Sequence, residues 1–331
     1  MKVVDMHCDT LAALRGAAQK GESMELRSNP LHLDLEKMKQ GDYMLQNFAM
    51  FVYLESGEDP MTTVMQLTDI FYQEMEKNKD VIGMVRSYDD ILENNRLGKM
   101  SALLTVEEGG VCKGELAVLR NLYRLGVRMM TLTWNFENEL AYPNVMRTGD
   151  GPLNPLVPNT TLGLKEKGFA FIEEMERLGI IIDVSHLSDK GFYDIYEHTT
   201  KPFVASHSNA RALGSHCRNL TDDMIRKLAE RGGVTGLNYC PAFVMDATEE
   251  EKAICTVKRL AEHARYLANV GGIECVGLGS DFDGIGGELE MKNCSMLPLL
   301  EQELKKQGFH ESEIEAIFHK NVLRVYKEIL Q

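Results

Sequence analysis

Short segments of apolar and β-branched residues alternate with longer amphipathic segments along the whole chain, and this alternation limits the folds that the chain can adopt. Runs of about four to eight such residues are typical of strands, whereas the longer segments repeat apolar residues with helical spacing. Eight strands are predicted, at Val3–Asp9, Leu45–Tyr53, Ala102–Glu107, Val127–Trp134, Ile180–His186, Phe203–His207, Val234–Tyr239 and Val276–Asp281. Eight strands separated by helical segments favour an α/β fold, a (β/α)8 TIM barrel.

The segments between these strands predict helices, and no change in composition marks a domain boundary. The predicted helices are Leu11–Gln19, Pro60–Lys77, Glu115–Leu125, Leu162–Leu178, Asp189–Glu197, Thr221–Glu230, Thr248–Ala268 and a last helix, Glu311–Leu330, that closes the barrel. The main irregular segment, Asn135–Thr161, is rich in Pro and Gly and follows the fourth strand. In a barrel, such a long loop would lie over the face that carries the active site. We therefore expect a single barrel domain over residues 1–331.

Composition and charge exclude several classes of partner. The formal net charge of −14 argues against binding to nucleic acid or to a membrane surface, since both need a basic patch. No apolar run approaches the roughly 20 residues that span a bilayer, and the first strand begins too near the N-terminus to leave room for a signal peptide. Seven cysteines without paired spacing are expected to be reduced thiols, which favours a cytoplasmic location.

Residues that commonly bind metals stand at the carboxyl ends of five predicted strands. They are His7, Asp9, Glu107, His186, His207, Asp281 and Asp283. Barrel closure brings the carboxyl ends of all strands to one rim, so these side chains would converge there. Carboxylates at that density would repel one another and raise each other's pKa, and a divalent metal removes this conflict. Mixed nitrogen and oxygen ligands suit zinc, with manganese, iron or cobalt as alternatives.

The alternation of side chains along a strand decides between neighbouring acids. Glu107 shares the parity of Thr105, whereas the apolar residues beside Thr105 suit the helix-facing side, so Glu107 rather than Glu108 is expected to face inward. Two ions about 3.5–4 Å apart need a bridging carboxylate, and Glu107 is the candidate. Asp5 and Asp183 lie inside strands and are expected to orient ligands from behind.

The first and last strands carry the simplest patterns. His7 and Asp9 are two residues apart, so they should point the same way, with Met6 and Cys8 on the opposite face. Gly277 and Gly279 precede the aspartates of the eighth strand on one face and are expected to leave room for substrate or metal. The remaining histidines are expected on the surface or in packing: His32, His198, His216, His263, His310 and His319.

Taken together, these motifs resemble the membrane (renal) dipeptidase family, the M19 metallopeptidases within the amidohydrolase-like barrels. The matching blocks are Asp5-x-His7-x-Asp9, Val106-Glu107, Asp183-x-Ser185-His186, Ser206-His207-Ser208, Arg218-Asn219, Gly279-x-Asp281-Phe282-Asp283-Gly284 and Asn321-Val322-Leu323-Arg324-Val325. The blocks follow one another from residue 5 to residue 325, so the resemblance covers essentially the whole chain. It implies a single metal-dependent hydrolase barrel.

The resemblance also implies roles for individual residues. Two zinc ions would be bound per chain, one by the residues of the first strand and one by the histidines of the fifth and sixth strands, with Glu107 as the bridge. Asp281 would be the general acid/base, and Arg218 would pair with the free carboxylate of the substrate, a role that suits its planar guanidinium. The implied activity is that of a soluble dipeptidase acting on dipeptides with a free C-terminal carboxylate, and the implied assembly is a homodimer.

One position departs from the family pattern. Animal members carry a histidine at the end of strand four that polarises the scissile carbonyl, and the matching position here is Trp134. An indole N–H can donate a hydrogen bond but cannot act as an imidazole. Asn135, Asn138 or a metal ion is left to supply the electrophile, so Trp134 and Asn135 are expected to contact the substrate.

Two alternative functions stay open. The chain could be another metal-dependent amidohydrolase that acts on N-acyl amino acids or cyclic amides, although strand four offers no lysine of the kind that is carboxylated in many such enzymes. It could also be an inactive barrel that serves as a binding module. The presence of all five candidate ligands and of Asp281 argues against the second alternative.

Overall fold

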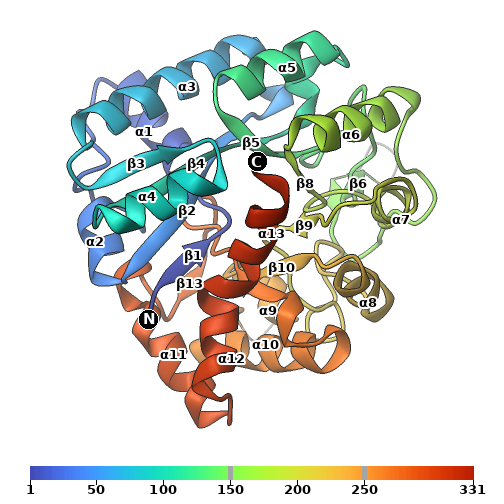
Figure 1. Ribbon diagram of the computed structural model, residues 1–331. Helices are drawn as coiled ribbons and strands as arrows, with labels where there is room; N and C mark the ends of the chain where they lie inside the picture. The colour runs from blue at the N-terminus through green and yellow to red at the C-terminus, as the bar shows by residue number, and fades with distance from the viewer. Residues whose placement is uncertain (148–151, 248–251) are drawn as a thin grey trace.

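A closed parallel barrel forms the centre of the computed structural model, which describes residues 1–147, 152–247 and 252–331 (Figure 1). The barrel strands are β1 (Val3–Asp5), β2 (Tyr43–Phe51), β4 (Met100–Glu107), β5 (Val127–Thr131), β8 (Ile181–Asp183), β9 (Val204–Ala205), β10 (Val234–Leu237) and β12 (Val276–Leu278). Their order is β2-β1-β12-β10-β9-β8-β5-β4, and pairing of β4 with β2 closes the ring. The predicted (β/α)8 barrel, with all eight predicted strands, is confirmed.

Helices surround the barrel, and a few short strands lie outside it (Figure 1). The helices are α1 (Thr10–Gln19), α2 (Leu35–Gln40), α3 (Pro60–Lys77), α4 (Tyr88–Arg96), α5 (Leu116–Arg124), α6 (Glu166–Leu178), α7 (Asp189–His198), α8 (Asp222–Glu230), α9 (Pro241–Val244), α10 (Val257–Gly271), α11 (Leu297–Lys306), α12 (Glu311–Glu315) and α13 (Asn321–Ile329). The short strands are β3 (Ile82–Val85), β6 (Met146–Arg147), β7 (Leu153–Asn154), β11 (Ile254–Cys255) and β13 (Glu288–Leu289). None of the described helices is both long and apolar enough to cross a membrane.

Several boundaries differ from the sequence prediction. β1 ends at Asp5 rather than Asp9, and β8 ends at Asp183 rather than His186, so His7, Asp9 and His186 stand on the loops directly after these strands. The predicted helix Thr248–Ala268 starts among residues that lie outside the described ones. From residue 252 the chain first forms β11, which pairs with β13, and α10 begins only after the Thr256 cap.

The C-terminal helix closes the barrel, as predicted. The predicted single helix is α12, a π-helical turn (Ala316–Lys320) and α13 in succession. A layer of apolar side chains, here called the barrel floor, joins the barrel strands to α13. Its members include Val4, Met6, Leu45, Leu103, Met129, Ile181, Val204 and Val234 from the strands and their ends, and Val322, Val325, Tyr326 and Ile329 from α13.

Gly277 in β12 and Gly279 directly after it allow close packing within the barrel and do not make room for the substrate. A Cβ at Gly277 would lie 3.0 Å from Val322 Cγ2, and a Cβ at Gly279 would overlap the carbonyl oxygen of Ser206. The expectation that both glycines leave room for substrate or metal is therefore wrong, because α13 and the end of β9 occupy that space.

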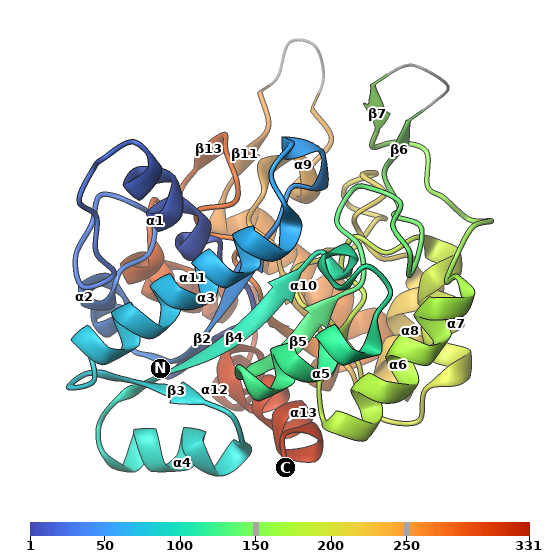
Figure 2. The ribbon, with the colours of Figure 1, turned by 90° about the horizontal axis from the view of Figure 1, so that it is seen from above.

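The two ends of the barrel are built differently (Figure 2). The β6–β7 hairpin, which belongs to the irregular segment Asn135–Thr161, rises at one end, and α13 with the C-terminus lies at the other. Asn135, where this segment begins, lines the cavity at the carboxyl ends of the strands. The long loop therefore lies at the face on which active sites of such barrels are found.

Candidate active site

The five predicted metal ligands meet at the carboxyl rim of the barrel, and all five are buried. They are His7, Asp9, Glu107, His186 and His207. Glu107 lies at the centre: its Oε1 is 3.0 Å from His186 Nε2 and 3.7 Å from His207 Nε2. Its Oε2 is 3.4 Å from His7 Nε2, which in turn is 3.3 Å from Asp9 Oδ2. One carboxylate in contact with three imidazoles is the arrangement expected of a bridging ligand.

Hydrogen bonds behind two of the histidines decide which ring nitrogen faces the cluster. The Nδ1 of His207 bonds to Ser206 Oγ at 2.6 Å, and Ser206 Oγ also bonds to the Asp183 carboxylate. Because a carboxylate only accepts, Ser206 donates to Asp183 and His207 donates to Ser206. His186 Nδ1 likewise donates to Asn135 Oδ1 at 2.9 Å. The two Nε2 lone pairs then face each other across 3.1 Å, which is repulsive unless a cation lies between them.

The chain turns after β1 so that His7 and Asp9 both face the cluster. Met6 belongs to the barrel floor, so the prediction that Met6 and His7 occupy opposite faces is wrong. Strand alternation ends before His7, because the Asp5 carboxylate accepts hydrogen bonds from the backbone N–H groups of His7, at 3.2 Å, and Ser280, at 2.9 Å. Asp5 orients a ligand from behind, as predicted.

A buried oxygen of Asp9 is a second observation that indicates a cation-binding site. Asp9 Oδ1 is buried and has no hydrogen-bond partner among the described residues. Leaving a buried carboxylate oxygen unpaired costs free energy, and a bound cation would remove that cost. The donor set of imidazoles and carboxylates, with neutral Nε2 atoms aimed inward, therefore fits divalent metal.

Four residues at the rim adopt backbone conformations with positive φ that non-glycine residues rarely use. The φ angle is 67° at His186, 62° at Asp281, 70° at Asp283 and 101° at Glu108. Such conformations cost about 1–3 kcal/mol and are found mainly where the surrounding structure requires them, often at functional sites.

Burial and neighbouring charges set the protonation of the cluster. Burial acts to raise the pKa of Glu107, but the imidazoles of His7 and His186 outweigh it and hold that pKa well below its usual value. Burial and the guanidinium of Arg218 lower the pKa of His186 to about 4, and burial also lowers that of His207. Burial would lower the pKa of His7 too, but the carboxylates of Glu107 and Asp9 outweigh burial and raise that pKa well above its usual value. Metal binding requires ionised carboxylates and neutral imidazoles. The surroundings of Glu107, His186 and His207 favour these forms, whereas His7 would give up a proton to the solvent when an ion binds.

Asp281 lies at the edge of the cluster and reaches the cavity. Its Oδ2 accepts a hydrogen bond from Asn238 Nδ2 at 2.9 Å, and its Oδ1 lies 4.0 Å from His7 Nε2. Burial, reinforced by the carboxylates of Asp9 and Glu107, raises the pKa of Asp281 to about 8. A carboxyl group in these surroundings can hold a proton in the pH range where peptides are hydrolysed by enzymes.

Asp283 also lines the cavity, but both of its oxygens are engaged. Oδ1 accepts from the backbone N–H of His32 at 2.7 Å, and Oδ2 accepts from the Thr10 hydroxyl at 2.6 Å. His32 Nδ1 accepts in return from the backbone N–H of Asp283. Asp283 thus holds the His32 loop against the start of α1, a contact that the sequence did not reveal. His263, in contrast, is the buried packing residue that was expected.

Arg218 is 4% exposed and lies next to His207. Its terminal nitrogens donate to Ser208 Oγ at 3.1 Å and to the carbonyl of His207 at 3.2 Å, and its guanidinium lies 5.5 Å from the ring centroid of Phe243, which lines the cavity. Its Nε–H is buried without a partner among the described residues. A buried guanidinium with an unused N–H can take a further acceptor, such as a carboxylate. His216 only accepts from the Arg218 backbone and does not join the cluster.

Trp134 lines the cavity, and its backbone is held by a second acid. The backbone N–H of Trp134 donates to Glu108 Oε2 at 2.9 Å. Glu108 is fully buried and binds the loop after β5, whereas Glu107 faces the cluster, so the predicted division between the two acids is found. Burial raises the pKa of Glu108 to about 7.

Of the two asparagines proposed to replace the missing histidine, one is excluded. Asn135 Oδ1 accepts from His186, and its amide N–H groups donate to none of the described residues, at a position that lines the cavity. Asn138 donates to Glu108 and to the carbonyl of Leu132, and its oxygen accepts from two backbone N–H groups of the loop. The suggestion that Asn138 polarises the substrate is therefore wrong.

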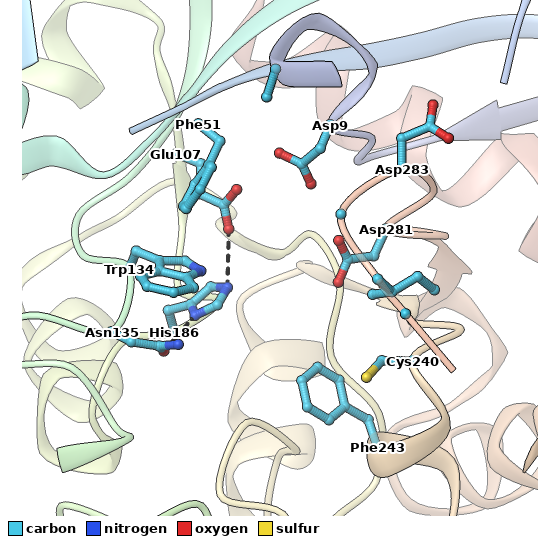
Figure 3. A pocket seen from close by; sticks show the side chains of 14 residues that line it. Asp9, Phe51, Glu107, Trp134, Asn135, His186, Cys240, Phe243, Asp281 and Asp283 are labelled. Atoms are coloured by element: carbon cyan, nitrogen blue, oxygen red, sulfur yellow. Dashed lines mark hydrogen bonds and ion pairs between the residues drawn. The ribbon is translucent and has the colours of Figure 1, made fainter. Parts of the chain in front are cut away.

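A cavity of about 400 Å³ opens beside the cluster (Figure 3). It is lined by Asp9, Ala12, Phe51, Glu107, Trp134, Asn135, His186, Cys240, Phe243, Asp281, Asp283, Gly284, Ile285 and Gly286. The analysis of the sequence missed Phe51, Cys240 and Phe243, which are apolar or weakly polar and form no motif. Their one sequence signal is position: Phe51 ends β2, and the other two follow β10.

A (β/α)8 barrel with a buried cluster of imidazoles and carboxylates at its carboxyl rim defines the class of metal-dependent hydrolases. The family model described as membrane dipeptidase (peptidase family M19) matches residues 1–331. The chain therefore belongs to this family and is a metallo-dipeptidase, which confirms the resemblance seen in the sequence.

Known relatives agree with this assignment. An uncharacterised dipeptidase of Schizosaccharomyces pombe is 34% identical over 99% of this chain and 80% of its own length. A dipeptidase of Clonostachys rogersoniana is 29% identical over 99% of this chain and 84% of its own. The crystal structure of dipeptidase AC, of family M19, has a TM-score of 0.90 and 25% identity, covering 100% of this chain and 99% of that chain. A Rhodobacter sphaeroides metallopeptidase, liganded with a phosphinate mimic of the dipeptide L-Ala-D-Ala, has a TM-score of 0.87, with 24% identity and 99% coverage of both chains.

The chain of hydrogen bonds from Asp183 through Ser206 to His207, here called the relay, generates a prediction. In Asp183→Asn, the amide can no longer accept from all of its partners, so the orientation of Ser206 and the Nδ1 proton of His207 are less well fixed. We expect the affinity for divalent metal to fall about 10–100-fold, measured by competition with a chromogenic chelator. Asp69→Asn, on the exposed face of α3, is the matched control. Unchanged metal affinity in Asp183→Asn would contradict the relay.

Proposed function

We propose that this chain is a binuclear zinc dipeptidase that hydrolyses dipeptides with a free C-terminal carboxylate. The observation that carries the proposal is Glu107, whose two oxygens reach imidazoles on both sides of the cluster. His7 and Asp9 would hold one ion, and His186 and His207 the other. The dipeptide mimic carried by the Rhodobacter sphaeroides relative is the kind of ligand that a cavity of this size would accept.

The residues around the cluster would have separate roles in hydrolysis. When bound, divalent zinc supplies Lewis-acid polarisation of a carbonyl and lowers the pKa of water. Asp281, held by Asn238, would accept a proton from the attacking water and deliver it to the leaving amine. Arg218, fixed by Ser208, would bind the substrate carboxylate through its free Nε–H. Asn135 would keep His186 in place and offer its amide N–H to the substrate.

The direct test combines metal analysis with a substrate panel. Protein purified without chelator should contain about two divalent ions per chain, and it should hydrolyse free dipeptides. Removal of metal should abolish hydrolysis, and zinc should restore it. Full dipeptidase activity of metal-free protein would contradict the proposal. Hydrolysis of N-acyl amino acids or cyclic amides without hydrolysis of dipeptides would favour the alternative amidohydrolase function.

The role of Arg218 is tested with substrates that differ only at the C-terminus. Because the guanidinium would pair with the carboxylate, Arg218→Ala should lower kcat/KM for free dipeptides with metal content unchanged. C-terminally amidated dipeptides should be poor substrates of the parent and should lose little further activity. Arg226→Ala, an exposed arginine on α8, is the control. Equal cleavage of free and amidated dipeptides by the parent would refute the carboxylate contact.

The two aspartates after β12 are predicted to differ. Asp281→Asn keeps the shape of the side chain but removes the proton acceptor, so kcat should fall about 10²–10⁴-fold with both metals bound. Asp283→Asn should cost less activity, since one Asp283 oxygen accepts from the His32 backbone and the other from the Thr10 hydroxyl. Steady-state kinetics and metal analysis of both variants distinguish them. Equal and mild effects would show that Asp281 is not the proton carrier.

A further inference from the structure

Aromatic rings form one side of the cavity (Figure 3). Phe51 and Trp134 line it, with ring centroids 5.1 Å apart and an interplanar angle of 66°. We call this pair the aromatic wall. Tyr53 and Phe136 support it from behind, at 5.7 Å and 5.5 Å from the Trp134 ring and 5.2 Å from each other. Edge-to-face contacts of this kind hold the rings in place, so the wall is formed before any ligand binds.

The backbone places the aromatic wall beside the reacting centre. Phe51 is the last residue of β2, and its direct partner in the sheet is Glu107. Trp134 is fixed through its backbone by the buried Glu108, and its ring centroid lies 6.0 Å from that of His186. A group bound against the wall would therefore be adjacent to the carbonyl that sits over Glu107.

Strand order places Phe51 of the aromatic wall opposite the carboxylate site, whereas Trp134 follows β5, between Phe51 and β8 in the ring. In the ring of eight strands, β2 is four strands away from β9 in either direction. Phe51 ends β2, whereas Arg218 follows β9 and packs near Phe243 after β10. A dipeptide whose carboxylate is at Arg218 and whose scissile carbonyl is over Glu107 must extend its N-terminal residue toward β2.

The other residues that line the cavity disfavour one class of N-terminal side chain in the substrate. Three aspartates, Asp9, Asp281 and Asp283, stand on the other walls, and no lysine or arginine is among the described lining residues. A negatively charged N-terminal side chain would leave water there without a lysine or arginine to pair with, which disfavours its binding.

From these observations we propose that the aromatic wall receives the side chain of the substrate's N-terminal residue, and that the enzyme selects aromatic or large aliphatic residues there. The proposal rests on the proposed function, because the carboxylate contact at Arg218 orients the dipeptide. Phe51 becomes a specificity-determining residue.

The test measures kcat and KM of the zinc-loaded enzyme for Phe-Gly, Leu-Gly, Ala-Gly, Glu-Gly and Gly-Phe. For the parent we expect kcat/KM to be about tenfold higher for Phe-Gly than for Ala-Gly, since an aromatic ring gains both buried area and ring contacts. Glu-Gly should be the poorest substrate. Phe51→Ala should reduce the Phe-Gly to Ala-Gly ratio about tenfold and leave the Gly-Phe to Ala-Gly ratio unchanged, because that ring would lie at the Arg218 end.

Control variants distinguish a change in substrate specificity from a general loss of structure. Phe169→Ala, a half-buried phenylalanine on α6 outside the cavity, should change no ratio. Phe51→Leu keeps an apolar side chain and should reduce the ratio less; it replaces Phe51→Ala as the test if that variant does not fold. A parent ratio near one, a ratio unchanged in the Phe51 variants, or a change confined to Gly-Phe would overturn the proposal. Failure of the proposed function looks different: the parent would hydrolyse no dipeptide at all.

Discussion

The contact of one carboxylate with three imidazoles is the interaction on which the rest of this site depends. Glu107 reaches His7, His186 and His207, which come from three other places along the chain. Charged groups taken out of water need compensation, and hydrogen bonds from the protein do not reach every ligand atom. The hydrogen bonds behind the histidines instead set their lone pairs inward, toward a cation. The fold supplies the geometry, and a bound metal ion would supply the missing charge.

Seven carboxylates of the described residues lie in the cluster or next to it, and they fall into two groups according to their hydrogen bonds. Asp5, Glu108, Asp183 and Asp283 are engaged by backbone and side-chain donors and hold strand ends and loops in place. Asp9, Glu107 and Asp281 keep oxygens that face the cluster or the cavity. The carboxylates of the first group, which are engaged in hydrogen bonds, hold the site in shape. Those of the second group keep oxygens that could bind a metal ion or the substrate.

The barrel and the meeting of the candidate ligands at one rim could be predicted because both follow from local patterns: apolar strands of regular spacing, five of them followed by residues of metal-binding type. Strand ends could not, because they depend on distant partners. The Asp5 carboxylate, for example, ends β1 by accepting from Ser280, 275 residues away in sequence. The residues that line the cavity could not be predicted either, since Phe51 is indistinguishable in sequence from a core residue. Asn138 was misjudged for a related reason, because its amide is fully engaged by Glu108 and by contacts within its own loop.

The barrel floor has a consequence for how the chain folds. Val322, Val325, Tyr326 and Ile329 come after every barrel strand in the sequence, yet they pack against residues as early as Val4. While a ribosome is still adding α13, the apolar layer at the base of the strands has no cover. Its contacts span nearly the whole chain, which makes them slow to form and leaves partly made barrels prone to aggregation. Cooperative closure must therefore wait for the last helix, and a chaperone that shields this layer during synthesis would protect the nascent enzyme.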